Sequence, residues 1–169
     1  SEYVQGYFEY DSKKSGGVTV SHLRIGPEKI EAPYYVTNAD LIVVTKDEYF
    51  SKYSVLEKAK ENSILLINTH DDKACLEKMS YQNLEMITQK NLRVLTIDAD
   101  DIALKHHLPG KISKIMEVVI LNLLGVTDAL DKLNKSIVSQ FLTKGEDIVK
   151  NNQEAILDAT SMVRKLAVV

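Results

Sequence analysis

Short apolar runs alternate with amphipathic stretches along most of the chain. Three runs, at residues 40–45, 64–68 and 92–97, are largely apolar, the form expected of strands with both faces covered by helices. The segments between these runs have helical composition. This alternation predicts an α/β fold with parallel central strands.

The first part of the chain has a different pattern. Residues 3–10 are rich in aromatic and β-branched types, and residues 18–24 alternate apolar and polar positions imperfectly, so both predict strands. The polar, glycine-ended segment 11–17 between them suits a hairpin loop or a ligand-facing turn. We therefore expect a three-layer α/β/α fold with a mixed sheet, in which an N-terminal antiparallel hairpin is followed by parallel strands.

Apolar positions at helical spacing predict the helices. These span residues 47–62, 111–124, 128–142 and 147–168, with a shorter helix from Asp98 or Asp100 to His107. Residues 71–88 are more polar, and we expect an irregular segment there. The helix at 111–124 has the broadest apolar face and should be the buried spine of the fold. We find no repeat and no linker, which predicts a single domain over residues 1–169.

Composition and charge narrow the class of protein. Of the 169 residues, 44% are hydrophobic and 27% charged, which is typical of a globular chain. A formal net charge of −3 gives no bulk attraction to nucleic acid or anionic lipid, and no apolar run reaches the roughly 18 residues of a membrane span. With no secretory signal and a single cysteine, Cys75, we expect a cytoplasmic protein without nucleic-acid or membrane partners.

The hairpin loop carries the clearest candidate binding chemistry. Lys13 and Lys14 supply two cations beside Ser12 and Ser15, and the following glycines let the backbone approach a ligand closely. This chemistry suits phosphate, although the glycine and lysine order of a P-loop is absent. Taken alone, a lysine pair in a polar turn is more often a solvated loop.

The histidines favour structural roles. His106 and His107 are adjacent, which turns them about 100° apart on a helix and suits a helix end better than a shared metal ion. His22 lies in a predicted strand and His70 follows one, and neither has a recognisable catalytic partner.

The remaining candidates are also explained by structure. The acidic segment 98–101 resembles a metal cluster, but a helix cap after a strand accounts for it. Cys75 lies near Lys73 and Lys78 and could be somewhat reactive, yet no base accompanies it. The pair 151–152 is typical of a helix surface. We predict no catalytic residue and no metal ligand in this chain.

Residues 5–26 read QGYFEYDSKKSGGVTVSHLRIG. This run closely resembles the pyruvate:ferredoxin (flavodoxin) oxidoreductases, in the domain that corresponds to the gamma subunit of multi-subunit 2-oxoacid oxidoreductases. The form DSKKSGG is similar to the gamma-type domain III of the fused, single-chain enzymes. The likeness continues through Ala39-Asp40, Tyr53, Leu56-Glu57, Asn68, Ile97-Asp98-Ala99, Pro109-Gly110-Lys111-Ile112, Ile115-Met116, Leu124-Gly125-Val126, Lys144-Gly145-Glu146, Ile148-Val149 and Asn152.

The resemblance implies a role within a larger enzyme. Such enzymes convert pyruvate and coenzyme A to acetyl-CoA, CO2 and reduced ferredoxin or flavodoxin, with thiamine diphosphate, Mg and 4Fe–4S clusters that lie outside this domain. This domain would bind coenzyme A and assemble with the other domains of the same oxidoreductase, whose parent is expected to be a homodimer. Because the family has a strand and a glycine-rich turn ahead of Gln5, we expect the chain to be a fragment, inactive when isolated.

The resemblance also implies site residues. The pair Lys13 and Lys14 matches the family's contact to a coenzyme A phosphate, and Asn152 matches a second contact. A third contact, an asparagine in the family, falls on Ser113, which is shorter and has no amide.

Two other interpretations stay open. In the first, the chain is a non-catalytic subunit-interaction domain of the same type of complex, in which the hairpin and the helix at 111–124 serve contact alone. In the second, it is a free-standing flavodoxin-like binding domain. The second is disfavoured because the first parallel strand is followed by neither an acidic pocket nor a phosphate-binding loop.

Overall fold

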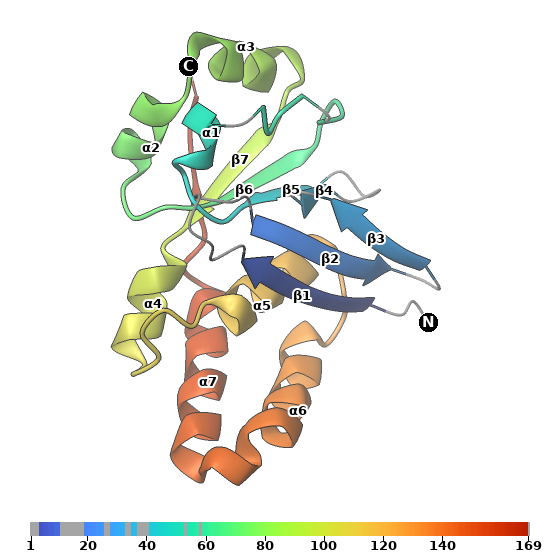
Figure 1. Ribbon diagram of the computed structural model, residues 1–169, viewed down its shortest axis with the longest axis vertical. Coiled ribbons are helices and arrows are strands. Elements are labelled where there is room, and N and C mark those ends of the chain that lie inside the picture. The colour runs from blue at the N-terminus through green and yellow to red at the C-terminus, as the bar shows by residue number, and fades with distance from the viewer. Residues whose placement is uncertain are drawn as a thin grey trace. The chain divides into compact units, whose positions relative to one another are not determined.

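The computed structural model describes the backbone of residues 4–10, 19–25, 28–32, 35–36, 41–52, 54–57 and 59–168, and the side chains from residue 41 onward within these ranges. The chain divides into two compact units (Figure 1). The first unit comprises residues 1–96 and 164–169, and the second comprises residues 97–163. The prediction of a single domain over residues 1–169 stays a prediction.

The first unit contains two sheets (Figure 1). The antiparallel sheet has the order β1-β2-β3, formed by β1 (Val4–Tyr10), β2 (Thr19–Ile25) and β3 (Glu28–Ala32). The five-stranded sheet has the order β4-β5-β6-β7-β8, formed by β4 (Tyr35–Val36), β5 (Leu41–Val44), β6 (Ile64–Asn68), β7 (Arg93–Ile97) and β8 (Arg164–Lys165). In this sheet β5 and β6 are parallel, and both edge strands pair antiparallel to their neighbours.

The predicted α/β class is confirmed, with the antiparallel hairpin β1–β2 ahead of the parallel strands. The hairpin and the parallel strands belong to separate sheets. The central strands β5, β6 and β7 are buried almost throughout, which explains their apolar composition.

Two helix predictions in the first unit are wrong. The helix expected over 47–62 is one turn, α1 (Tyr49–Lys52), and turns follow it. Leu56 and Ala59 are nevertheless buried, because irregular backbone brings them into the same core as the strands. Tyr53, assigned to the same stripe, lies outside the described residues.

The segment expected to be irregular instead forms two helices, α2 (Asp72–Lys78) and α3 (Tyr81–Gln89). Each begins at a capping side chain. Asp71 accepts hydrogen bonds from the backbone amides of Lys73 and Ala74, and Ser80 accepts one from the amide of Asn83. The caps were the sequence signal, since polar composition hid the short amphipathic stripes behind them.

The second unit contains helices α4 (Ala99–Lys105), α5 (Ser113–Leu123), α6 (Ala129–Phe141) and α7 (Glu146–Ala159), with the 3-10 turn η1 (Leu142–Lys144) between α6 and α7. Helix α5 packs against both α6 and α7 (Figure 1). Its buried side chains are Ile115, Met116, Val118, Val119 and Ile120, which confirms the predicted spine. The last helix ends at Ala159 rather than continuing to residue 168, and the chain returns to the sheet as β8.

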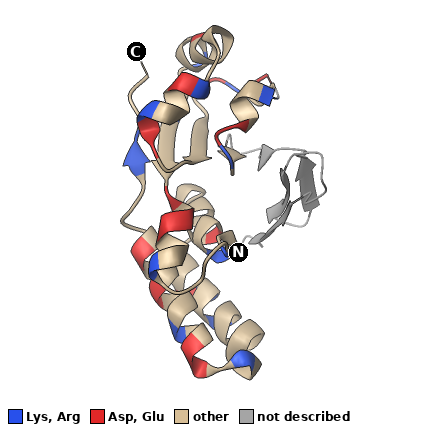
Figure 2. Cartoon of the chain, turned by 60° about the vertical axis from the view of Figure 1, so that its left-hand side comes forward, with Lys and Arg blue, Asp and Glu red and all other residues tan. Residues whose placement is uncertain are grey.

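Acidic and basic side chains are interspersed along the helices of each unit (Figure 2). Within the described part of the chain, no helix has both the length and the apolar character needed to cross a membrane.

Candidate functional site

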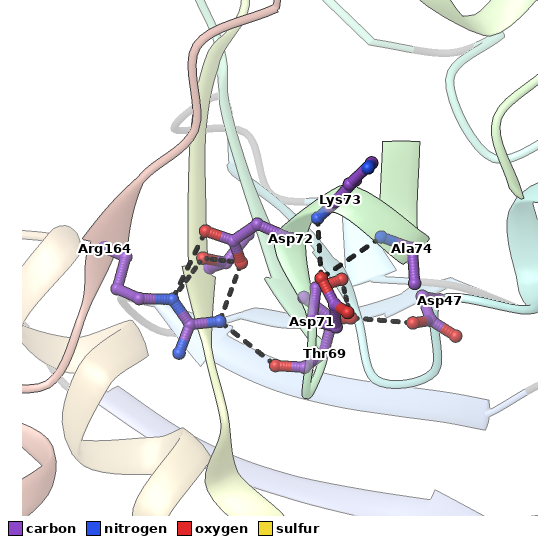
Figure 3. A network of polar contacts seen from close by, with 8 residues as sticks. Asp47, Thr69, Asp71, Asp72, Lys73, Ala74 and Arg164 are labelled. Carbon is purple, nitrogen blue, oxygen red and sulfur yellow. Dashed lines mark hydrogen bonds and ion pairs between the residues drawn. The ribbon is translucent and has the colours of Figure 1, made fainter. Parts of the chain in front are cut away.

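A network of polar side chains lies at the carboxyl ends of the parallel strands in the first unit (Figure 3). Its centre is the pair Arg164–Asp72, in which Arg164 Nη2 donates to Asp72 Oδ1 at 2.7 Å and Nε donates to Asp72 Oδ2 at 3.3 Å. Arg164 Nε also donates to Thr96 Oγ1 at 3.2 Å, and Nη2 donates to the Thr69 carbonyl at 3.2 Å. The guanidinium thereby joins β8 to β7 and to the loop after β6.

The network extends to the loop after β5. Thr69 Oγ1 donates to Asp47 Oδ2 at 2.7 Å, and Lys78 Nζ donates to Asp47 Oδ1 at 2.8 Å. Asn68 Nδ2 donates to the Thr45 carbonyl at 3.2 Å. Ligands of open α/β sheets bind at this edge. Here the protein's own side chains are paired with one another at that position, so the network favours a structural role.

The pair sets the ionisation of Asp72. Burial alone would raise the pKa of Asp72, but hydrogen bonds from Arg164 and Thr96 and the charge of Arg164 together lower it below its ordinary value of 3.8. Sequence reasoning missed this network. The available signal was a polar residue at the end of each central strand, namely Thr45, Asn68 and Thr96.

Cys75 lies beside this network and is fully buried. Burial, followed by the nearby charges of Asp47 and Asp72, raises the pKa of the Cys75 thiol to about 11. The expectation of a somewhat reactive thiol is therefore wrong, because the thiolate is the reactive form and little of it exists at neutral pH. The nearby lysines do not offset the burial.

The second unit contains a helix end of different character. Ser113, one of the predicted site residues, is the first residue of α5 and is half-buried. Ile112 occupies the N-cap and supplies no side-chain hydrogen bond. The backbone amides of residues 113–115 donate no hydrogen bond to any residue that the structure describes. Such amides, at the positive end of a helix dipole, favour an anion.

One turn further along α5, Lys114 and Glu117 form a mostly buried ion pair. Lys114 Nζ lies 3.4 Å from Glu117 Oε2, and the two side chains are 17% and 12% exposed. Burial raises the pKa of Glu117, and the Lys114 charge and hydrogen bond lower it in part. The ammonium group is therefore held close to the start of α5.

Asn152, the second predicted site residue described, lies on α7, which packs against α5. It is 6% exposed, so the expectation of a surface asparagine pair is wrong at this position. Asn152 Nδ2 donates to the Ile148 carbonyl at 2.8 Å, one turn back in the helix. Its Oδ1 accepts no hydrogen bond from the described residues, which leaves an acceptor at the packed face of α7.

The other predicted residues have structural roles or lie outside the described part. His106 is the C-cap of α4, and its Nε2 lies 3.0 Å from Asp158 Oδ2 on α7, which confirms a helix-end role. Asp98 is the N-cap of α4 and accepts from the Asp101 amide at 3.0 Å, which confirms the cap. Lys13 and Lys14 lie outside the described residues, as does the side chain of His22.

Among the side chains that the structure describes, no group of three or more histidine, cysteine, aspartate or glutamate residues is arranged to hold a metal ion. The candidate site is thus built from amides, a hydroxyl, an ammonium group and an asparagine carbonyl. These groups suit recognition of an anionic or nucleotide-like ligand and supply no general base aimed at a substrate.

Residues 1–162 match the family model described as Pyruvate ferredoxin/flavodoxin oxidoreductase. The chain belongs to this family. It is 37% identical over 158 residues to the pyruvate:ferredoxin oxidoreductase of Moorella thermoacetica, a match that covers 91% of this chain. The chain spans 14% of the length of that relative. The family resemblance inferred from residues 5–26 is therefore confirmed.

Two solved structures share the fold. The pyruvate oxidoreductase subunit PORC of Thermotoga maritima matches with a TM-score of 0.70 and 25% identity, over 98% of this chain and 83% of that one. A 2-oxoglutarate:ferredoxin oxidoreductase from Magnetococcus marinus, determined with 2-oxoglutarate, coenzyme A and succinyl-CoA bound, matches with a TM-score of 0.64 and 14% identity. That second match covers 95% of this chain and 25% of that protein. Domains of this family thus occur in chains of very different length.

Proposed function

We propose that this chain is the coenzyme A-binding and assembly domain of a 2-oxoacid oxidoreductase, with pyruvate as the 2-oxoacid. The parent enzyme would convert pyruvate and coenzyme A to acetyl-CoA and CO2 and pass electrons to ferredoxin or flavodoxin. Thiamine diphosphate, Mg and 4Fe–4S clusters would be held by other parts of the enzyme. Residues 1–169 would act as one domain within a homodimeric, cytoplasmic parent.

The observation that carries this proposal is the open start of α5. Three unpaired amides, the Ser113 hydroxyl and the nearby Lys114 ammonium fit the oxygens of a phosphate group, because all are donors at the positive end of a helix. In the family an asparagine would make this contact, and Ser113 would replace it with a shorter donor. The backbone amides, which do not depend on the side chain, would supply the rest.

Asn152 supports the same proposal from the neighbouring helix. Its Nδ2 is held by the Ile148 carbonyl, so the amide plane is fixed and Oδ1 is the free end. A fixed carbonyl acceptor suits an N–H or O–H group of the nucleotide or pantetheine part of coenzyme A. Lys13 and Lys14 would contribute a phosphate contact from the hairpin loop. Coenzyme A is bound in the Magnetococcus marinus relative, which has the same fold.

The test is coenzyme A binding by the full-length enzyme, measured by calorimetry. Charge-assisted contacts to phosphate contribute roughly 1.5–3 kcal/mol each, so replacing Lys13 and Lys14 with alanine should weaken binding by about tenfold or more. The effect should shrink at high salt. Asn152→Ala should weaken binding by a smaller factor. Decarboxylation of the 2-oxoacid without coenzyme A should stay near normal in all variants.

Matched controls separate these contacts from general charge and helix effects. Lys73→Ala removes an exposed lysine of α2, and Asn151→Ala changes the residue next to Asn152. Neither should alter coenzyme A affinity. If the lysine and Asn152 variants bind coenzyme A as tightly as the parent does, the subunit-interaction interpretation replaces this proposal.

A further inference from the structure

A pocket of about 400 Å³ lies in the first unit, between α1 and the junction of α2 and α3. Phe50, Met79 and Met86 supply its apolar lining, and Phe50 and Met79 are themselves nearly buried. Ser80 and Gln82 add polar groups from the start of α3. Methionine side chains are flexible and polarizable, and they adapt to varied apolar partners. The pocket can therefore take up an apolar group.

Asn83 places a fixed acceptor in the same pocket. The residue is 4% exposed, and its Nδ2 donates to the Phe50 carbonyl at 3.2 Å. Its Oδ1 accepts no hydrogen bond from the described part of the chain. A buried acceptor without a partner lowers stability by the cost of its desolvation, unless a ligand or water donates to it. The geometry matches a backbone N–H that enters the pocket.

Tyr81 stands beside the pocket on the first turn of α3, next to the lining residues Ser80 and Gln82. Its side chain is 79% exposed, the largest exposed fraction among the large hydrophobic residues that the structure describes. Tyrosine is enriched among the residues that dominate binding energy in protein interfaces, because it combines a large apolar ring with a hydroxyl.

The charges around the pocket are balanced. Lys78 Nζ lies 2.8 Å from Asp47 Oδ1, and Lys52 Nζ lies 3.6 Å from Glu48 Oε2. Each lining lysine thus has a carboxylate partner, and the rim offers no net attraction to an anionic cofactor. This charge balance favours an uncharged polypeptide segment over a nucleotide.

The relatives indicate where such a segment would come from. This chain spans 14% of the Moorella thermoacetica enzyme but 83% of the separate subunit PORC. The same domain is therefore a part of one long chain in one protein and a subunit in another. A subunit has no covalent link to the rest of its enzyme, so its surface must carry a non-covalent docking site.

We propose that Tyr81 and the adjacent pocket form the docking surface for a polypeptide segment from the rest of the oxidoreductase. An apolar side chain of that segment packs against Met79 and Met86, one of its backbone N–H groups donates to Asn83 Oδ1, and Tyr81 packs across it. This inference rests on the part of the proposed function that makes the chain a domain of a larger enzyme. It does not depend on coenzyme A binding.

The first test is site-specific photo-crosslinking in the full-length oxidoreductase. A benzoylphenylalanine replaces Tyr81, and a matched control carries it at the exposed Lys73 on α2. Mass spectrometry then identifies the linked peptides. We expect the probe at position 81 to link to a peptide of the oxidoreductase outside residues 1–169, one that the probe at position 73 does not label. A link to a second copy of α3, or to no protein, overturns the proposal.

The second test compares hydrogen exchange of the α3 amides in the isolated chain and in the full-length enzyme. We expect exchange to slow by about tenfold or more in the full-length enzyme, Tyr81→Ser to remove most of that protection and Tyr81→Phe to retain it. The melting temperature of the isolated Tyr81→Ser chain should match the parent, because the side chain is exposed. Equal exchange in both forms of the protein overturns the proposal. Coenzyme A affinity should be unchanged by Tyr81→Ser, so this result and the test of the proposed function can fail separately.

Discussion

The polar groups of the two units differ in how completely they are paired. In the first unit, both carboxylate oxygens of Asp72 accept hydrogen bonds, and Thr69 and Thr96 are paired with neighbours. In the second unit, Asn152 Oδ1 and the first amides of α5 lack partners among the described residues, and Asn134 Oδ1 is buried with none. A completed network serves the fold, whereas unpaired buried groups lower stability and need an outside partner to offset that loss. Position at a sheet edge alone would have assigned the ligand to the wrong unit.

The largest effect should come from breaking the core that holds the open groups in place. Ile120 is 3% exposed on α5. In Ile120→Asp an unpaired carboxylate would be buried, which costs several kcal/mol against a typical total stability of about 5–15 kcal/mol. We expect the second unit to unfold, as measured by circular dichroism and hydrogen exchange. Leu104→Asp, at a site 64% exposed, is the control and should fold normally. A soluble Ile120→Asp protein that melts within a degree or two of the parent would contradict the assignment of α5 as the spine.

The next effect concerns the completed network. Arg164→Ala removes four hydrogen bonds at once. Buried charged hydrogen bonds contribute about 1.5–3 kcal/mol each, but the Arg164 side chain is 38% exposed, so we expect a loss of about 2 kcal/mol in total. Chemical denaturation measures this difference. Lys105→Ala, which breaks the more exposed pair with Asp101, should change stability by less than about 0.5 kcal/mol. Equal effects of the two variants would show that the network adds no stability.

The same network predicts a pH dependence. Because the pKa of Asp72 is lower in the folded protein than its ordinary value of 3.8, its contribution is complete above that value. The contribution is lost as the pH falls through the lower, folded pKa. The stability difference between the parent and Asp72→Asn should therefore be constant at neutral pH and vanish at strongly acidic pH. A difference that persists below the folded pKa would contradict the assigned pairing.

A smaller effect, of opposite sign, is expected where a polar group is buried without a partner. Asn134→Leu removes the unpaired Oδ1 on α6 and should raise the free energy of unfolding by about 1 kcal/mol. The control is Gln140→Leu at an exposed position of the same helix, which should change stability by less than about 0.5 kcal/mol. If Asn134→Leu destabilises the isolated chain, Asn134 has a partner that the contrast between the units leaves out.

The smallest effect should come from Glu117. Its pKa is raised by burial, so the protonated form contributes stability that is complete below the ordinary value of 4.5 and lost as the pH rises through the raised pKa. Glu117→Gln should not show this loss. Melting temperatures measured across that window should converge less than about 1 kcal/mol apart, because Lys114 offsets part of the burial. Parallel pH profiles for the two proteins would contradict a raised pKa.

The sequence predicts those features that arise from local pattern. The apolar run at β6 has the observed bounds, and the stripe of α5 is buried as its spacing indicates. The same reasoning failed where long-range packing competes with periodicity. Leu56 and Ala59 lie at helical spacing yet reach the core from turns, and residues 160–168 leave helical structure so that Arg164 can pair with Asp72.

The candidate site was predicted in part. The family resemblance led to Ser113 and Asn152, but the unpaired amides of α5 could not be foreseen, because the absence of a cap depends on where the helix begins. The Arg164 network joins residues 92 and 68 positions apart, and no local pattern relates them. Residue types at strand ends can indicate that polar side chains meet, but the partner that completes them is set by the tertiary fold.

The pairing of Thr96 with Arg164 has a consequence for the order in which the protein folds during synthesis. These two residues face each other across β7 and β8, and all of the second unit lies between them in the chain. The ribosome must therefore release residues 97–163 before Arg164 can reach Asp72 and the sheet can gain its last strand. Until then β7 is an unprotected edge strand, open to pairing with other chains. Early folding of the α5–α7 bundle would shorten the time that this edge is exposed, since a folded insertion brings its two ends together for β8 to close.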